Sequence, residues 1–268
     1  MIGIFDSGFG GLTIFGDIER QLPEYDYIYL GDNARAPYGN HSQELIYEYT
    51  RQAVDYLFNQ GCDLIILACH TASAEALRKL QQEYLPKNWP GKNVLGVIRP
   101  IAEEAIRLSS GKKVAVIGTQ STIDSQSYIR EIQHQDPSIA VIQQACPLLV
   151  PIIEEGQIQA PSTRQILRDY LESIKEAKPD VLILGCTHYG WLYDIINKLL
   201  GGQVQILDSG RIVAEKLADY LARHSDLVKK SLAEPQRIFL TTDDNKKFDR
   251  AAQKWLGREI KSQIIKLT

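Results

Sequence analysis

A repeated segment constrains the fold of this chain more than any other feature. Residues 63–69 read DLIILAC and residues 180–186 read DVLILGC, so an Asp, an apolar stretch and a Cys recur in the same order. In each copy a Thr and a His follow within two residues. Short apolar stretches of this length are typical of buried parallel strands. The repeat therefore predicts two related halves, each presenting a cysteine at the end of a strand.

The rest of the chain alternates short apolar runs with longer segments of helical periodicity, the pattern of parallel strands joined by crossover helices. We predict the α/β class, with two pseudo-symmetric α/β domains, mostly parallel sheets and the active site in the interdomain cleft. Strands are expected at 2–5, 27–30, 64–68, 93–97, 114–117, 140–143, 181–185, 204–207 and 237–241. Helices are expected at positions that include 42–60, 72–84, 162–176 and 211–224.

Two boundaries divide the predicted domains. One is placed near Arg99-Pro100, because a proline disfavours helix continuation at the preceding residue, and the other near Asp208. The first domain then comprises residues 1–98 plus 208–268, and the second comprises residues 99–207. The C-terminal stretch is expected to return to the first half.

Composition excludes several classes of protein. Hydrophobic residues make up 44% and charged residues 24%, which is ordinary globular usage and excludes a disordered or collagen-like chain. The net charge of −3 gives no basic field for nucleic acid or an anionic membrane. The N-terminus has no signal-peptide pattern and no apolar run is long enough for a membrane span, so we expect a cytoplasmic protein.

The four cysteines form no CxxC pair and no metal-like cluster with the five histidines, so neither a metal nor a disulfide is predicted. A single strand-end cysteine is often an inert buried side chain, which is our interpretation of Cys62 and Cys146. Cys69 and Cys186 instead precede expected helix starts, where a helix N-terminus lowers the pKa of a thiol. Their matched contexts favour a functional pair.

Two opposed thiols suit the inversion of a carbon centre. One thiolate removes a proton from one face while a thiol of similar pKa delivers a proton to the other. The substrate carbon must fit between them, so we expect the two sulfur atoms about 6 to 9 Å apart.

Polar neighbours of the two cysteines each allow two interpretations. Asp6 is either a turn former or a carboxylate that assists Cys69. His188 is either a surface residue or an acid/base helper, which its position two residues after Cys186 favours. Glu154 and Glu155 either begin a solvated helix or supply a site carboxylate.

Three glycines, Gly8, Gly10 and Gly11, follow the first predicted strand in DSGFGG. Backbone amides there could hold a phosphate or a carboxylate. The segment lacks the Lys and Ser/Thr of a P-loop and the spacing of a dinucleotide fold, so neither nucleotide class is indicated.

Five segments taken together resemble the glutamate racemases of the aspartate/glutamate racemase superfamily, in order and over nearly the whole chain. They are FDSGFGG (5–11), GDNARAPYG (31–39), ACHTAS (68–73), CPLLVPIIEEG (146–156) and GCTHYG (185–190). The resemblance implies a cofactor-independent isomerase that interconverts L- and D-glutamate and supplies D-glutamate for peptidoglycan, and so for cell wall biogenesis and cell shape. It also implies a homodimer.

The resemblance also implies roles for individual residues. Cys69 would act on the D-enantiomer with help from Asp6, and Cys186 on the L-enantiomer with help from His188 and Glu154. The substrate would be bound by Ser7, Tyr38, Gly39, His70, Thr71, Thr119, Thr122 and Thr187. This sequence departs from the family at His70, where Asn is usual.

Two alternatives stay open from the sequence. The first is a racemase of another amino acid such as aspartate, or a decarboxylase, although a one-thiol decarboxylase should lack one of the two cysteines. The second is a non-catalytic ligand-binding or regulatory protein with the same fold. A pyridoxal phosphate enzyme is a third and weaker reading, because no lysine lies at a convincing strand end.

Overall fold

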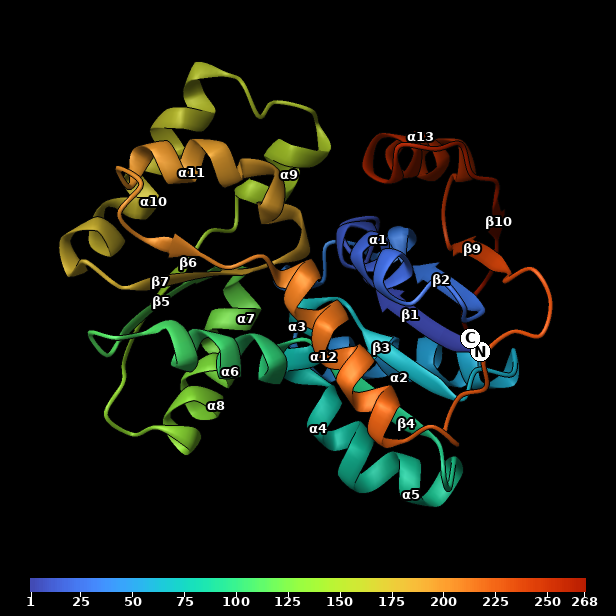
Figure 1. Ribbon diagram of the computed structural model, residues 1–268. Coiled ribbons are helices and arrows are strands. Elements are labelled where there is room, and N and C mark those ends of the chain that lie inside the picture. The colour runs from blue at the N-terminus through green and yellow to red at the C-terminus, as the bar shows by residue number, and fades with distance from the viewer.

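The computed structural model describes residues 1–268, which form two parallel β-sheets with helices packed on them (Figure 1). The six-stranded sheet has the order β10-β9-β2-β1-β3-β4 and the four-stranded sheet the order β6-β5-β7-β8. The first sheet consists of β1 (Ile2–Asp6), β2 (Tyr27–Gly31), β3 (Leu64–Leu67), β4 (Asn93–Gly96), β9 (Arg237–Thr241) and β10 (Ser262–Ile264). The second consists of β5 (Lys113–Gly118), β6 (Ala140–Ala145), β7 (Val181–Gly185) and β8 (Gln205–Ile206).

The two sheets repeat one topology. The order β2-β1-β3-β4 in the first corresponds to β6-β5-β7-β8 in the second, and every pairing is parallel. The repeated sequence segments form the equivalent strands β3 and β7, which are buried along their whole length. The predicted fold class is therefore confirmed. Because the carboxyl ends of these strands bear Cys69 and Cys186, the topology gives the two thiols equivalent positions.

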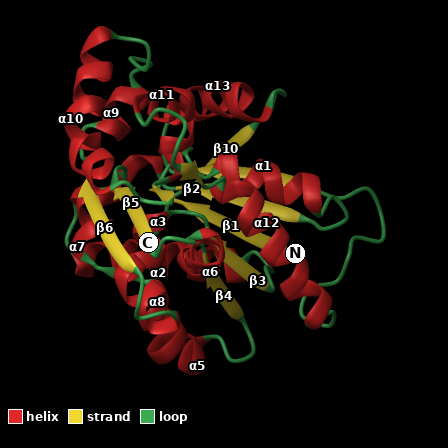
Figure 2. Ribbon diagram, turned by 60° about the vertical axis from the view of Figure 1, so that its left-hand side comes forward, coloured by secondary structure: helices red, strands yellow, loops and turns green.

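Helices connect the strands and cover both sheets (Figure 2). The α-helices are α1 (Leu12–Gln21), α2 (Gln43–Asn59), α3 (His70–Glu75), α4 (Leu77–Lys79), α5 (Leu85–Asn88), α6 (Ile98–Leu108), α7 (Gln120–Asp124), α8 (Ser127–Gln135), α9 (Leu149–Glu154), α10 (Pro161–Ala177), α11 (Tyr193–Leu199), α12 (Ser209–Arg223) and α13 (Asn245–Leu256). Three 3₁₀ segments (Asn33–Arg35, Tyr38–Asn40 and Thr187–Leu192) and a π-helical turn (Leu80–Tyr84) complete the list. None of the helices combines the length and the apolar character that crossing a membrane requires.

Local sequence explains several helix starts. The Ser42 side chain accepts a hydrogen bond from the Leu45 amide at the start of α2, and the Asp208 side chain does the same for Arg211 at α12. Proline is the first residue of α10, where its missing N–H costs nothing. These caps satisfy amides that the helix itself leaves without partners.

One apolar core runs through both domains. It contains 36 buried residues, among them Ile2 and Tyr29 from the first sheet and Val114 and Val181 from the second. Helix α12, orange in Figure 1, contacts both α1 and α6 within this core. Separate clusters fill the other face of each sheet. The strand-end residues of the two domains are thus positioned by a shared core.

The structure differs from the sequence predictions in three places. Pro100 lies in the first turn of α6, which begins at Ile98, because a proline is tolerated where helical amides have no partner. The helix expected at 72–84 begins at His70 and is interrupted, with α3, α4 and a π-helical turn in its place. The short edge strand β10 was not predicted. The domain boundaries themselves stay predictions, although β9 pairs with β2 in the first sheet.

Candidate active site

Cys69 lies between β3 and α3 and is buried. Its sulfur accepts a hydrogen bond from the Ala72 amide at 3.4 Å and so caps α3, and its thiol donates to Ser7 Oγ at 3.5 Å. Burial first, and then the charge on Asp6, raise the pKa of Cys69 to about 11 against the lowering effect of these hydrogen bonds. The expected lowering of this pKa by the helix start is therefore wrong for the free protein, because lost hydration outweighs the amide contact.

Cys186 follows β7, but a 3₁₀ segment rather than an α-helix comes after it. Its sulfur lies 3.9 Å from His188 Nδ1, and His188 Nε2 lies 3.1 Å from Glu154 Oε1. A carboxylate only accepts, so Nε2 carries the proton and Nδ1 is left to accept from the Cys186 thiol. Burial holds the pKa of Cys186 well above its ordinary value, and the charges of Cys69 and Asp6 act in the same direction. The expected lowering is wrong here too.

Asp6 connects the surroundings of the two cysteines. It ends β1, is fully buried, and accepts hydrogen bonds from the Gly8 amide at 3.0 Å and from Thr187 Oγ1 at 3.4 Å. Burial raises the pKa of Asp6, and the charge of His188 opposes this shift. Since its own charge raises the pKa of both thiols, one carboxylate lies within electrostatic range of both.

Three threonine hydroxyls from the two domains form a closed cluster. Thr71 Oγ1 lies 3.0 Å from Thr119 Oγ1 and 3.2 Å from Thr122 Oγ1, and the last two lie 3.0 Å apart. Thr71 belongs to α3 in the first domain, whereas Thr119 and Thr122 follow β5 in the second. All three are buried. Such hydroxyls can donate to or accept from a charged ligand without adding charge.

Tyr38 and Gly39 lie in the 3₁₀ segment that packs against α7. The Tyr38 hydroxyl donates to the Asp32 carboxylate, so the proton of this hydroxyl is already engaged within the protein. A Cβ on Gly39 would lie 2.5 Å from Thr119 Cβ. Glycine at this position permits the close approach of the two domains.

The glycines after β1 have a packing role that the sequence analysis missed. A Cβ on Gly10 would lie 2.5 Å from His188 Nδ1, and one on Gly11 would lie 2.6 Å from Asp6 Cβ. No side chain fits at either place. The segment therefore brings its backbone against His188 and Asp6, which explains Gly10 and Gly11 by packing alone.

Aromatic side chains enclose His188. Phe9 and Trp255 each lie with ring centroids 5.8 Å from the imidazole, and Trp255 also packs on Trp191 at 4.8 Å. Trp255 comes from α13, far from His188 in the sequence, and no sequence pattern pointed to it. These rings limit the movement of His188 and leave it 4% exposed.

His70 is 1% exposed, and its Nδ1 lies 2.8 Å from the Tyr128 hydroxyl. Burial lowers the pKa of His70 to about 3, so the ring is neutral at physiological pH. Ser7 and Thr187, the remaining predicted binding residues, contact Cys69 and Asp6 as described. The structure thus brings together Ser7 with Cys69, His188 with both Cys186 and Glu154, and Thr71 with both Thr119 and Thr122.

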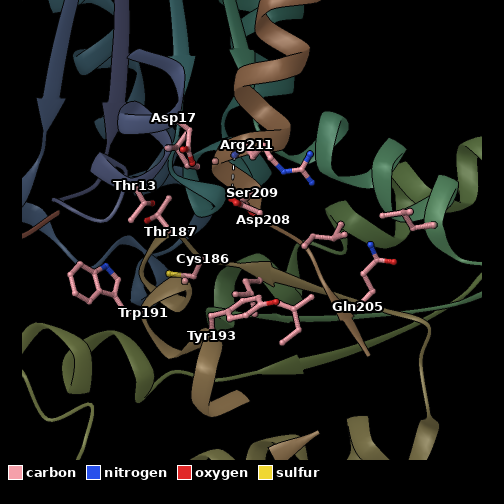
Figure 3. A pocket seen from close by; sticks show the side chains of 17 residues that line it. Thr13, Asp17, Cys186, Thr187, Trp191, Tyr193, Gln205, Asp208, Ser209 and Arg211 are labelled. Carbon is pink, nitrogen blue, oxygen red and sulfur yellow. Dashed lines mark hydrogen bonds between the residues drawn. The ribbon is translucent and has the colours of Figure 1, made fainter. Parts of the chain in front are cut away.

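A cavity of about 700 Å³ adjoins Cys186 from one side (Figure 3). Cys186, Thr187 and Trp191 line it together with Thr13 of α1 and Ser209 at the start of α12. Cys62 and Cys146 take no part in the site, and burial raises the pKa of each to about 12. No three His, Cys, Asp or Glu side chains gather in a way that suits a metal ion.

Two buried thiols thus follow equivalent strands, one beside a hydroxyl and the other beside an imidazole–carboxylate pair. The fold is that of a two-domain racemase. The chain belongs to the Asp/Glu/Hydantoin racemase family, whose model matches residues 10–217.

Similar proteins cover the whole chain. A glutamate racemase from Dinoroseobacter shibae is 39% identical over 276 residues, which are 98% of this chain and 98% of that protein. The crystal structure of a glutamate racemase isoform from Bacillus anthracis superposes with a TM-score of 0.92 at 35% identity, covering 100% of this chain and 97% of that one. A glutamate racemase from Francisella tularensis in complex with D-glutamate gives 0.89 at 33% identity, with 99% and 97% covered. This chain is therefore an amino-acid racemase, an isomerase, as predicted.

Proposed function

We propose that this racemase interconverts L- and D-glutamate without a cofactor, with Cys69 and Cys186 as the two bases. The observation that carries the proposal is the placement of two buried thiols at equivalent strand ends. The two lie close enough that a charge on Cys69 raises the pKa of Cys186. Full-length similarity to proteins named glutamate racemase supports glutamate as the substrate. The aspartate racemase of Picrophilus torridus is 20% identical and shares only the fold, so aspartate is not favoured.

In the L-to-D direction Cys186 takes the α-proton from one face, and the Cys69 thiol gives its proton to the other. The reverse reaction exchanges these roles. Because the pKa of both free thiols is raised, a proton acceptor must form the thiolate. His188 Nδ1 serves Cys186, with Glu154 holding the ring, and Asp6 serves Cys69. The substrate ammonium group would further favour the thiolate when bound.

Uncharged groups would hold the substrate. The candidates are the hydroxyls of Ser7, Thr71, Thr119, Thr122 and Thr187, the backbone at Tyr38 and Gly39, and the ring nitrogen Nε2 of His70, which has no hydrogen-bond partner within the protein. Buried donors that are held in place stabilise charge that develops on the carboxylate during proton removal.

The cellular setting follows from this activity. We propose that the protein is a cytoplasmic homodimer and that it supplies D-glutamate for peptidoglycan. Size-exclusion chromatography with light scattering measures the oligomeric state directly.

Circular dichroism of amino-acid solutions tests the substrate and the cofactor together. Protein freed of metal and pyridoxal phosphate should bring separate solutions of L- and D-glutamate to the same zero signal, and aspartate solutions should change far more slowly. If neither glutamate signal changes, the proposed activity is wrong. If aspartate changes as fast as glutamate, the substrate assignment is wrong.

A further inference from the structure

A buried hydrogen bond joins two side chains that the proposed chemistry does not use as acid or base. His70 Nδ1 lies 2.8 Å from the Tyr128 hydroxyl, and both residues are buried, at 1% and 0% exposure. His70 is the first residue of α3 and Tyr128 the second residue of α8. The bond therefore connects the first domain with the second.

Each partner lies beside the backbone next to one of the cysteines. His70 follows Cys69 in the chain. The Tyr128 ring packs against Gly185, where an added Cβ would lie 3.5 Å from Tyr128 Cε2, and Gly185 precedes Cys186. A charge on Cys186 raises the pKa of Tyr128 in addition to its burial. The hydrogen-bonded side chains of His70 and Tyr128 thus link the backbone next to Cys69 with the backbone next to Cys186.

The protonation of the pair is set by its surroundings. Burial lowers the pKa of His70 to about 3 and raises that of Tyr128 far above its ordinary value, so both groups stay neutral. The second ring nitrogen, Nε2, is buried without a hydrogen-bond partner. If Tyr128 donates to Nδ1, only the Nε2 proton lacks a partner, whereas the reverse direction would also leave the tyrosine proton unpaired. Tyr128 is therefore the donor.

Other contacts also hold α3 against α7 and α8, among them the hydrogen bonds of Thr71 described above. Ser127 Oγ donates to the Ala74 carbonyl at 3.0 Å and Ser121 Oγ to Glu75 Oε1 at 2.8 Å, both toward the end of α3. These bonds remain when the His70–Tyr128 bond is lost. That loss should therefore change the local placement of the thiols without separating the domains.

We propose that the His70–Tyr128 pair positions the two catalytic thiols relative to each other across the domain interface. This inference rests on the proposed two-thiol racemisation. His70 and Tyr128 act through the backbones that carry Cys69 and Cys186, and Nε2 of His70 stays free for the substrate contact proposed above. A change in the separation of the two thiols alters the distance from the substrate carbon to each of them, so the transfers at both thiols slow.

Kinetics of a variant set test this role. Tyr128→Phe removes only the hydroxyl, so kcat should fall about tenfold in both directions with KM within about twofold. The primary deuterium isotope effect from α-deuterated L- and D-glutamate should rise in both directions, a change that a purely structural role would not produce. His70→Leu should lower kcat to the same extent and also raise KM, because it removes the Nε2 contact. The kcat of the double variant should be no lower than that of either single variant.

Two further variants complete the set. His70→Asn keeps an amide atom near the position of Nδ1 and should restore much of the kcat that His70→Leu loses, while loss of the Nε2 contact should raise KM. Ser127→Ala removes a neighbouring bond between α3 and α8 and should lower the melting temperature without changing the isotope effect. Wild-type isotope effects in Tyr128→Phe, or losses that multiply in the double variant, would overturn the proposal.

Crystal structures supply a readout that does not depend on turnover. The distance between the sulfur atoms of Cys69 and Cys186 should differ by about 0.5 Å or more between the wild type and Tyr128→Phe. An unchanged distance contradicts the positioning role even if the enzyme is active. A changed distance in a protein that does not racemise glutamate supports the positioning role and refutes the proposed function alone.

Discussion

The surroundings of Cys69 and Cys186 differ far more than their sequences do. Both cysteines end equivalent strands of repeated topology. Cys69 is contacted by a hydroxyl and a backbone amide, whereas Cys186 is contacted by a histidine that is itself bonded to Glu154. Repetition of the fold therefore gives two thiols in equivalent positions, and the residues around them differ. Under the proposed mechanism each thiol would then pass its proton to a different acceptor. The reaction is symmetric because the products are enantiomers, but the two proton acceptors need not be alike.

Removal of either thiol should cause the largest loss of kcat, and the loss should be similar for Cys69 and Cys186. Cys69→Ser and Cys186→Ser each leave a hydroxyl whose proton is much harder to remove, so kcat for racemisation should fall by about 10³-fold or more. Cys62→Ala, which changes a buried cysteine outside the site, is the matched control and should stay within about threefold of wild type. If a serine variant racemises glutamate at close to the wild-type rate, the cysteine that it replaces is not a catalytic base and only packs in the core.

Loss of the His188 imidazole should impair proton transfer at Cys186 more than at Cys69. His188→Asn deprives Cys186 of its proton acceptor, so kcat should fall by roughly 100-fold. The step at Cys186 then becomes limiting, so the deuterium isotope effect should rise for α-deuterated L-glutamate and fall for the D-enantiomer. Glu154→Gln should shift the isotope effects in the same direction to a smaller extent. Equal isotope effects from both enantiomers in His188→Asn would mean that His188 serves both thiols.

A substitution at Gly10 in the first domain should reproduce part of the difference between the L- and D-glutamate isotope effects. Gly10→Ala forces a methyl group against His188 Nδ1, which should cost about 1 to 3 kcal/mol of unfolding free energy. It should also shift the isotope effects in the same sense as His188→Asn, because it displaces the imidazole. Gly190→Ala, whose added Cβ would meet no atom within 4 Å, is the control. Denaturant titration and isotope effects measure both outcomes.

The last prediction concerns His70, the neighbour of Cys69, and the free energy of unfolding at acid pH. The pKa of His70 is about 3 in the folded protein and about 6.5 when unfolded. Between these values the unfolded chain binds more protons, so stability falls as the pH decreases. From pH 7 to pH 5 the His70 contribution to this loss is about 2 kcal/mol. His70→Asn should lose less stability over this interval in denaturant titrations, and an unchanged pH slope would contradict the buried neutral ring.

Much of the fold could be predicted because buried parallel strands leave a strong apolar pattern. β7 was predicted over its full range and β9 likewise. The edge strand β10 has three residues, two of them exposed, and so leaves no such pattern. The interruption after α3 has no local signal either, since residues 72–84 suit a continuous helix and tertiary packing decides otherwise.

The site was predictable where chemistry follows a strand end, and not where packing alone decides. Asp6, His188 and both cysteines stand beside strand ends in the sequence. The contacts of Trp255 and Tyr128 depend on how distant helices pack, which local sequence does not encode. The direction of the thiol pKa shifts was also wrong, because burial, a property of the folded protein, outweighs the helix start that the sequence reveals.

Handed elimination by the two serine variants tests the central claim most directly. A glutamate analogue with chloride on the β-carbon loses chloride after its α-proton is removed, so a single thiolate suffices. Cys69→Ser should eliminate chloride only from the L-analogue through Cys186, and Cys186→Ser only from the D-analogue through Cys69. Chloride release measured for both enantiomers decides the matter. Opposite preferences are the predicted result, and the same preference in both variants would contradict a site in which one thiol works on each face.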